Sequence, residues 1–477
     1  MQNEKIFWRL AKALLLGYLA AITLFYFLAG EQLHLRRSRD NFPLPASDSG
    51  TVELSAGNTV EQLFCTEIQR LEQIEIQWGT YYRPNAGTIL VEVVDLRTGS
   101  VVLSQSFDAA GIPEGGITAL TAETPIEGLY QAPLLLRITS DSQAGSAVSP
   151  LMNSQIRKEG WQLDINGAAV PGVLCAALSG TDYIWTGLHY WEFAALGSVL
   201  VLLYLFAVWR RCRSGKRSYT LNAVIAVQKY RFLIRQLVGR DFKTKYKRSV
   251  LGIFWSFLNP LLTMLVQYFV FSSLFKSDVP QFAAYLIIGT VMFNFFSEAC
   301  GMSLTAILGN ASLITKVYMP KYIYPLTRVM SSMVNLGISL VPMLIVCLMT
   351  GVELKKSAVL AVYFLLCLAV FSLGLGLLLS TSMVFFRDTQ FLWGVMTMMW
   401  MYATPIFYPE SIIPENMKFI HSLNPLYHFL KNTRICILEG ISPEPRVYVQ
   451  CFLIALVALF AGALVFYKNQ DKFVLYL

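Results

Sequence analysis

The sequence has few of the residues from which catalytic and metal centres are built. Only 14% of its 477 residues are charged. Its four histidines, His34, His189, His421 and His428, stand too far apart for an H-E-x-x-H zinc motif or a catalytic triad. The eight cysteines show no metal-binding spacing. We therefore expect no metal site and no catalytic residues, and we predict that the chain is not an enzyme.

A nucleotide-binding loop is absent as well. No G-x-x-x-x-G-K-[ST] string occurs, because the one Gly-Lys pair, Gly215-Lys216, precedes an arginine and lacks the upstream glycine. Gly374 and Gly376 lie inside an apolar run, where close helix packing explains them better than a dinucleotide does. The chain therefore has no ATPase of its own.

Apolar residues, by contrast, are abundant. They make up 55% of the chain, and the mean hydropathy is +0.51. Segments of the length that crosses a hydrocarbon core of roughly 30 Å recur along it, and the composition predicts an α-helical polytopic membrane protein. The predicted spans are 12–29, 190–209, 251–275, 283–305, 323–350, 356–382, 389–408 and 446–467. The first could also be read as a cleaved signal peptide, but its length and the lack of a clear A-x-A site favour an uncleaved anchor over residues 1–30.

Charge is distributed unevenly. Residues 31–187 hold nine Lys/Arg and 18 Asp/Glu, a net charge of −9, whereas 13 of the 38 basic residues lie within 210–248. Basic residues next to spans mark the cytoplasmic side. We therefore predict that both termini are cytoplasmic and that 31–187 is extracytoplasmic, with the second span, 188–210, returning the chain.

The acidic region reads as strands. Segments such as 74–78, 88–94 and 101–107 alternate apolar and polar residues, and turn signals such as Asn166-Gly167 separate them. This pattern predicts an inserted all-β sandwich over 31–187. Cys65 and Cys175 are its two cysteines, and a disulfide between them stays open.

A basic, amphipathic stretch precedes the third span. Residues 211–249 form a basic linker and a helix with apolar residues near helical spacing, the pattern of a helix that lies in the membrane interface. Ordinary positive-inside anchoring is the plainer interpretation, but the length of the stretch exceeds what orientation requires.

Four motifs within 220–477 carry a resemblance. They are R-D-F-K-T-K-Y-K-R-S-V-L-G-I-F-W-S-F-L-N-P (240–260), N-A-S-L-I-T-K-V-Y-M-P-K-Y-I-Y-P-L (310–326), F-R-D (386–388), and T-P-I-F-Y-P (404–409) with N-P-L (424–426). In this order they resemble the type-2 ABC exporter permeases that export lipid-linked polysaccharides such as O-antigen, capsule and teichoic acid.

That resemblance implies a six-span permease core over 250–477, with a coupling loop at 306–322 and a re-entrant region at 409–440. It implies a homodimer in the inner membrane of a bacterium, two copies of a separate ATPase that bind ATP and Mg, contacts with membrane lipids, and a polyprenyl-pyrophosphate-linked glycan as substrate. No nucleic-acid partner is expected. The residues expected to contact the ATPase are Asn310, Leu313, Ile314, Lys316, Tyr318, Pro320 and Lys321.

Basic and aromatic side chains are the candidates for holding the substrate. Basic residues at the membrane surface attract phosphate, and the expected headgroup ligands are Arg240, Lys243, Lys245, Lys247 and Arg248. Flat rings stack on sugar faces, although core packing and interfacial belts use them too. The expected channel-lining residues are Tyr268, Phe271, Phe293, Phe296, Trp393, Trp400, Tyr402, Phe407 and Tyr408. In the β-domain the expected glycan-binding residues are Trp78, Tyr81, Tyr82 and Trp161. A role of the whole domain in docking or as a spacer is equally open.

Three other functions stay open at this point. The cargo of the exporter could be another lipid or a drug. A membrane glycosyltransferase would need membrane-proximal carboxylates, of which the predicted core spans have few, Glu298 being one. An anchored glycan receptor would use the spans only to hold the β-domain.

Overall fold

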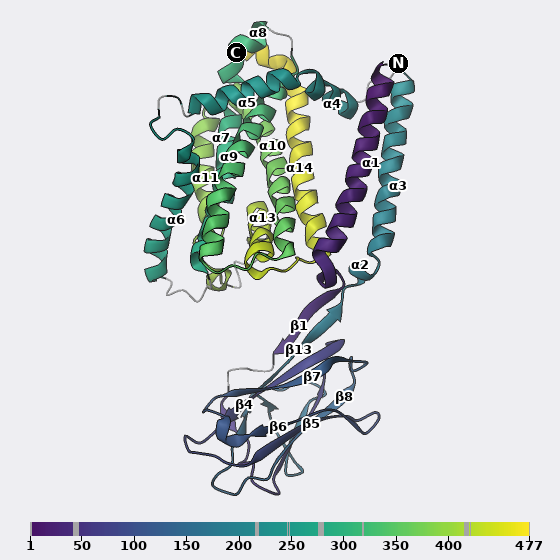
Figure 1. Cartoon of the computed structure of the whole chain (residues 1–477), viewed down its shortest axis with the longest axis vertical. Coiled ribbons are helices and arrows are strands. Elements are labelled where there is room, and N and C mark those ends of the chain that lie inside the picture. Colours follow the sequence, from purple (N-terminus) through teal and green to yellow (C-terminus); the bar gives the residue numbers. More distant parts are fainter. Residues whose placement is uncertain are drawn as a thin grey trace. The chain divides into compact units, whose positions relative to one another are not determined.

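The computed structural model describes residues 2–41, 47–214, 219–245, 247, 249–274, 281–316, 319–414, 419 and 421–476. It divides into a helical unit, Met1–Leu33 with His189–Leu477, and a β unit, His34–Leu188. Each unit has its own apolar core. Figure 1 shows the helices of the first unit and the strands of the second.

The β unit is a sandwich of two antiparallel sheets, as the alternating pattern predicted. One sheet has the order β1-β13-β4-β9-β12, with β2 on β9 and β7 on β4, and the other has the order β11-β10-β3-β8-β5-β6. The strands are β1 (Leu35–Asn41), β2 (Ser49–Gly50), β3 (Thr59–Cys65), β4 (Arg70–Gly79), β5 (Thr88–Asp95), β6 (Ser100–Asp108), β7 (Ile117–Glu127), β8 (Pro133–Ser140), β9 (Ser149–Asn153), β10 (Gln162–Ile165), β11 (Ala168–Val170), β12 (Val173–Leu174) and β13 (Ala176–Tyr183). Alternate residues of β3 point inward, so that Val60 and Phe64 are buried between the sheets.

Cys65 and Cys175 are both free thiols. Cys175 is completely buried, and burial, reinforced by the charge of Asp48, raises the pKa of its thiol to about 11. A thiol of this kind behaves as a small apolar side chain.

Seven helices within the described residues are long and apolar enough to cross a membrane. The main helices of these spans are α1 (Gln2–Ala29), α3 (Tyr190–Arg213), α6 (Phe254–Leu274), α7 (Phe282–Leu304), α9 (Ile323–Met349), α10 (Ala361–Phe385) and α14 (Pro445–Asn469). This confirms the predicted fold class, a helical polytopic membrane protein with an all-β domain.

The predicted span 389–408 is wrong in its length. It forms the helix α11 only over Thr389–Ala403, about 22 Å at 1.5 Å per residue. Its end is set by Pro405, since the residue before a proline avoids the helical region. Thr404 is accordingly extended (φ −106°, ψ 131°).

Two helix pairs show how the sequence sets close approach. Helices α10 and α14 meet at Gly374 and Gly462, where a Cβ on Gly462 would lie 2.0 Å from the Gly374 carbonyl oxygen. Only glycine allows this approach, which confirms the packing role of Gly374. Helices α1 and α3 run side by side (Figure 1), and the Tyr18 hydroxyl donates to the Ala194 carbonyl (3.0 Å).

Candidate functional site

A polar cavity lies among the membrane helices α6, α7 and α9. Its volume is about 720 Å³. Asn259 and Thr263 of α6 stand one helical turn apart, Asn294 and Ser297 lie on α7, and Ser339 lies on α9. Polar side chains inside spans are costly and usually mark the path of a solute. The cavity therefore offers amide and hydroxyl groups in a part of the chain that is otherwise apolar.

The charges at this cavity cancel. The Lys245 ammonium lies 2.7 Å from Glu298 Oε1, and the Asn335 amide donates to the same oxygen (2.6 Å). Lys245 ends α5 (Arg231–Lys245), whereas Glu298 lies on α7. Because the one lysine and the one glutamate of the lining pair with each other, the cavity suits a neutral ligand with hydroxyl groups better than an anion.

A second cavity of about 590 Å³ adjoins the first and shares Lys245 and Glu298 with it. At its wall the Asp241 carboxylate forms an ion pair with Arg328 (2.9 Å) and accepts hydrogen bonds from Arg240 (3.3 Å) and the Ser331 hydroxyl (3.4 Å). The Asp241 side chain is only 4% exposed. These bonds join α5 to α9.

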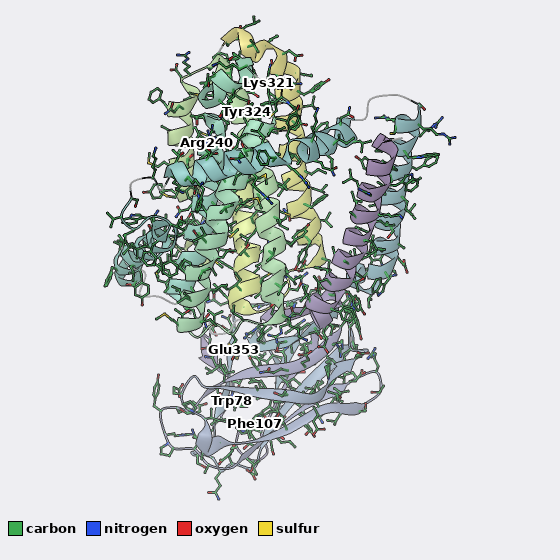
Figure 2. The ribbon with its side chains drawn as sticks, turned by 45° about the horizontal axis from the view of Figure 1, so that its top comes forward. Trp78, Phe107, Arg240, Lys321, Tyr324 and Glu353 are labelled. Atoms are coloured by element: carbon green, nitrogen blue, oxygen red, sulfur yellow. The ribbon has the colours of Figure 1, made fainter. Side chains whose placement is uncertain are left out.

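Helix α5 also contacts the short segment between α7 and α9. Arg240 donates to Asn310 Oδ1 (3.1 Å), and the buried Asn310 amide donates to the Ala306 carbonyl (2.8 Å). Apolar side chains of α5, of this segment and of the start of α9 share one core cluster, with Ile234, Leu237, Ala306, Ile307 and Ile323 among them. Figure 2 places Arg240, Tyr324 and Lys321 at one end of the helical unit. A displacement of this end would therefore move α5 and α9 together.

The other predicted coupling residues are distributed around this end. Leu313 and Ile314, on α8 (Ala311–Lys316), are half-buried and pack against the same core cluster, whereas Lys316 is exposed. Lys321 donates to the Gln470 carbonyl (2.5 Å) and Pro320 is half-buried. Tyr318 lies outside the described residues.

The basic residues predicted to bind a lipid phosphate divide into two groups. Lys245 forms an ion pair with Glu298, which balances its charge, whereas Arg240 shares the single carboxylate of Asp241 with Arg328. Lys243 and Lys247 are exposed. Arg248 lies outside the described residues. The expected cluster is therefore less positive than its sequence indicates.

The predicted channel aromatics also divide. Phe296 is completely buried and packs edge-on against Trp400 (5.3 Å between ring centroids), so the prediction that it lines a channel is wrong. Phe407 is buried and stacks on the half-buried Phe271 (5.4 Å), so it too belongs to a packed core. Phe293, Trp393 and Tyr408 are half-buried, and only Tyr268 (40% exposed) and Tyr402 (61%) are open at the surface of the helical unit.

The β-domain aromatics follow the same division. Trp78 is completely buried and its indole N–H donates to the Thr118 hydroxyl (2.7 Å), so the prediction that it stacks on a glycan is wrong. Trp161 is half-buried against Phe64 (5.8 Å) and Lys158 (4.6 Å). Tyr81 and Tyr82 are exposed.

Sequence reasoning missed a buried arginine in the predicted re-entrant region. Helix α13 (Pro425–Arg434) is capped by Asn424, whose side chain accepts from the Leu426 amide. At its other end, the Arg434 guanidinium donates to the carbonyls of Pro405 (2.6 Å), Tyr285 (2.9 Å) and Ile406 (3.0 Å) and lies 3.4 Å from the Tyr285 ring centroid. No described residue gives it a carboxylate partner. Arg434 thus fixes the irregular chain after α11 against α7.

Comparisons with known proteins concern the helical unit. Residues 233–438 match the family described as ABC-2 type transporter. The chain is 29% identical over 255 residues to the O-antigen export system permease protein RfbA of Myxococcus xanthus, covering 53% of this chain and 98% of that protein. It is 28% identical over 246 residues to RfbA of Klebsiella pneumoniae (50% and 93%) and 24% identical over 248 residues to the polysialic acid transport protein KpsM of Escherichia coli (50% and 93%).

Proposed function

We propose that the chain is the permease subunit of an ABC exporter for a polyprenyl-pyrophosphate-linked polysaccharide, because residues 233–438 match the ABC-2 type transporter family. The relatives named as O-antigen and polysialic acid transport proteins support this cargo, since the chain spans nearly their whole length. ATP and Mg would bind to a separate ATPase.

The polar cavity carries the proposal. A sugar polymer presents many hydroxyl groups, each of which must exchange its bonds to water for bonds to the protein as it crosses the membrane. Asn259, Thr263, Asn294, Ser297 and Ser339 supply donors and acceptors of that kind. A hydrophobic drug would offer these groups no hydrogen bonds, so the cavity favours the glycan over that cargo.

We place the ATPase at the end of the helical unit formed by α5 and α8. Movement of α8 would reach α5 through the Arg240–Asn310 bond and α9 through the Asp241–Arg328 pair, and Arg240, Asp241 and Arg328 line the second cavity. The lipid phosphate would meet the exposed Lys243 and Lys247.

A second copy of the chain would complete the path. Helix α11 has no buried residue within the unit, and α6 is also little covered. Both present apolar side chains, such as Phe391 (75% exposed) and Phe269 (75%). We propose that these two helices pair with their copies in a homodimer. We also propose that the dimer lies in a bacterial inner membrane, with both termini in the cytoplasm and the β-domain outside.

Export in cells tests the proposal. Deleting the gene should abolish surface polysaccharide and leave lipid-linked polymer inside, and the wild-type gene should restore export. Asn294→Leu, which removes an amide from the cavity, should lower export several-fold at equal membrane abundance, whereas Val199→Leu, at a position 51% exposed on α3, should not. Normal surface polysaccharide in the deletion strain would refute the proposal.

A further inference from the structure

The loop between β4 and β5, residues 80–87, presents two adjacent tyrosines at one end of the β unit. Tyr82 is 91% exposed and Tyr81 is 49% exposed. Strand β4 runs antiparallel to β13, and the start of β4 at Arg70 pairs with Thr181 near the end of β13. The loop therefore lies at the end of the sandwich opposite the strand ends through which the chain enters and leaves.

Both tyrosines adopt a left-handed backbone, with φ of 55° at Tyr81 and 54° at Tyr82. Bulky side chains rarely occupy this region, which glycine and asparagine tolerate far better. Turn geometry alone would therefore favour glycine or asparagine at both positions. Backbone strain of this kind is often associated with binding sites.

The surrounding loops hold this conformation in place. The Glu114 carboxylate accepts from the Thr80 amide (2.6 Å), the Thr80 hydroxyl (2.7 Å) and the Tyr82 amide (3.4 Å). The Asn85 side chain, which is 8% exposed, donates to the carbonyls of Thr80 (3.1 Å) and Arg83 (3.2 Å). The tyrosines therefore stand on a braced loop.

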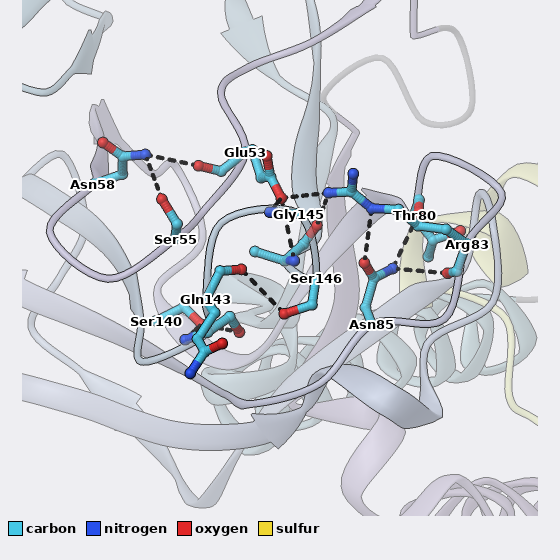
Figure 3. A network of polar contacts seen from close by, with 12 residues as sticks. Glu53, Ser55, Asn58, Thr80, Arg83, Asn85, Ser140, Gln143, Gly145 and Ser146 are labelled. Carbon is cyan, nitrogen blue, oxygen red and sulfur yellow. Dashed lines mark hydrogen bonds and ion pairs between the residues drawn. The ribbon is translucent and has the colours of Figure 1, made fainter.

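Arg83 extends the bracing to a neighbouring loop. It forms an ion pair with Glu53, which also accepts from the Gly145 amide (2.5 Å), and its guanidinium lies over the Tyr81 ring (4.9 Å). Figure 3 shows this network, which joins residues 53–58, 80–85 and 140–146. Because the base is fixed, a ligand on the rings would cause little loss of loop entropy.

We propose that Tyr81 and Tyr82 form a carbohydrate-stacking site for the glycan that the transporter exports, an inference that rests on the proposed function for the identity of the ligand. An aromatic ring covers one face of a sugar, so two rings match a short saccharide segment. A stable protein partner would need about 800 Å² of surface with an apolar centre, whereas here two rings stand above a polar network. The loop would hold the polymer after it has left the membrane domain.

Binding of the exported polymer to the full chain tests this site. The polymer is harvested from the surface of the producing bacterium and cleaved from its lipid, and the permease is purified in nanodiscs for biolayer interferometry. Tyr81→Asn with Tyr82→Asn removes both rings, yet asparagine accepts the backbone, so thermal stability should be equal or higher. We expect roughly tenfold weaker binding for this variant.

Two controls accompany the double variant. Tyr81→Phe with Tyr82→Phe keeps the rings and should bind within about twofold of wild type. Tyr130→Asn changes a tyrosine that is 50% exposed in the turn before β8, at the other end of the sandwich, and should bind like wild type.

The outcomes separate this site from the proposed function. Equal binding by the Asn double variant and wild type would overturn the site, as would wild type that binds no polymer. These results leave the export test untouched, because that test depends on the gene deletion and the cavity variant. Export that persists in the deletion strain would overturn the proposed function itself.

Discussion

Asp241→Asn should weaken the link between α5 and α9. The Asp241 side chain is 4% exposed and its partner Arg328 is 17% exposed, so the substitution leaves a largely buried guanidinium without its counter-charge. Breaking a buried pair costs about 3–5 kcal/mol and losing a charged hydrogen bond about 1.5–3 kcal/mol. The amide oxygen of asparagine still accepts from Arg328, and the adjoining cavity admits water, so we expect about 2 kcal/mol.

Thermal unfolding of the purified full chain measures this effect. At roughly 2 °C per kcal/mol for a large domain, Asp241→Asn should lower Tm by about 4 °C. Arg328→Gln should cost a similar amount, and the double variant much less than their sum, since neither charge is then left alone. Asp388→Asn, at an exposed carboxylate, is the matched control. In cells, we expect Asp241→Asn to retain ATPase activity and lose export.

An additive double variant would refute this reasoning. It would mean that Asp241 and Arg328 contribute independently and that their 2.9 Å contact does not join α5 to α9. If Asp241→Asn lowers Tm but exports normally, the ion pair stabilises the structure and does not couple the ATPase to transport.

Three further predictions follow from polar contacts. Lys245→Met leaves Glu298 without its ion pair and should lower export, and Glu298→Gln should restore part of it in the double variant, measured as surface polysaccharide. Arg434→Gln should destabilise the helical unit by about 2–4 kcal/mol. Arg434→Lys should be destabilised as well, because an ammonium lacks the planar fork that bonds three carbonyls. A Tm of either variant equal to that of wild type would contradict this. The hydrogen bond from the Thr80 hydroxyl lowers the pKa of Glu114, and bonds from backbone amides lower it further, although burial acts in the opposite direction. The ionised Glu114 carboxylate therefore stabilises the loop fully above the ordinary carboxyl pKa, and this stabilisation is lost as the pH falls through the lowered pKa of Glu114. The Tm of wild type should drop on acidification, and the Tm of Glu114→Gln should drop less.

The sequence predicted the larger features of the fold because they depend on long patterns. Apolar length identified the spans, and alternation identified the sandwich. The sequence did not predict that Trp78 is buried and Tyr82 exposed. Both lie near the end of one strand, and their burial depends on the opposite sheet. Tertiary packing decides such cases, and no pattern along a single chain reports it.

The polar cavity did leave a signal in the sequence. Asn259 and Thr263 are four residues apart in a predicted span, and such spacing places two polar groups on one helix face. The signal is weak because asparagine and threonine at this spacing also form ordinary contacts between membrane helices. Arg434 was hidden differently, since its three acceptors are backbone carbonyls, which every residue possesses.

Arg434 has a consequence for the order in which the protein is made. An arginine placed alone at the centre of a bilayer costs about 2.5–3.5 kcal/mol on insertion scales. Helix α13 would meet this barrier if it entered the lipid by itself. Its acceptors belong to Tyr285, Pro405 and Ile406, all of which leave the ribosome earlier, so that the receiving surface exists before the arginine arrives. The order of synthesis therefore matters for this helix, and a chain permuted to synthesise α13 first would have to insert the arginine before its acceptors are made.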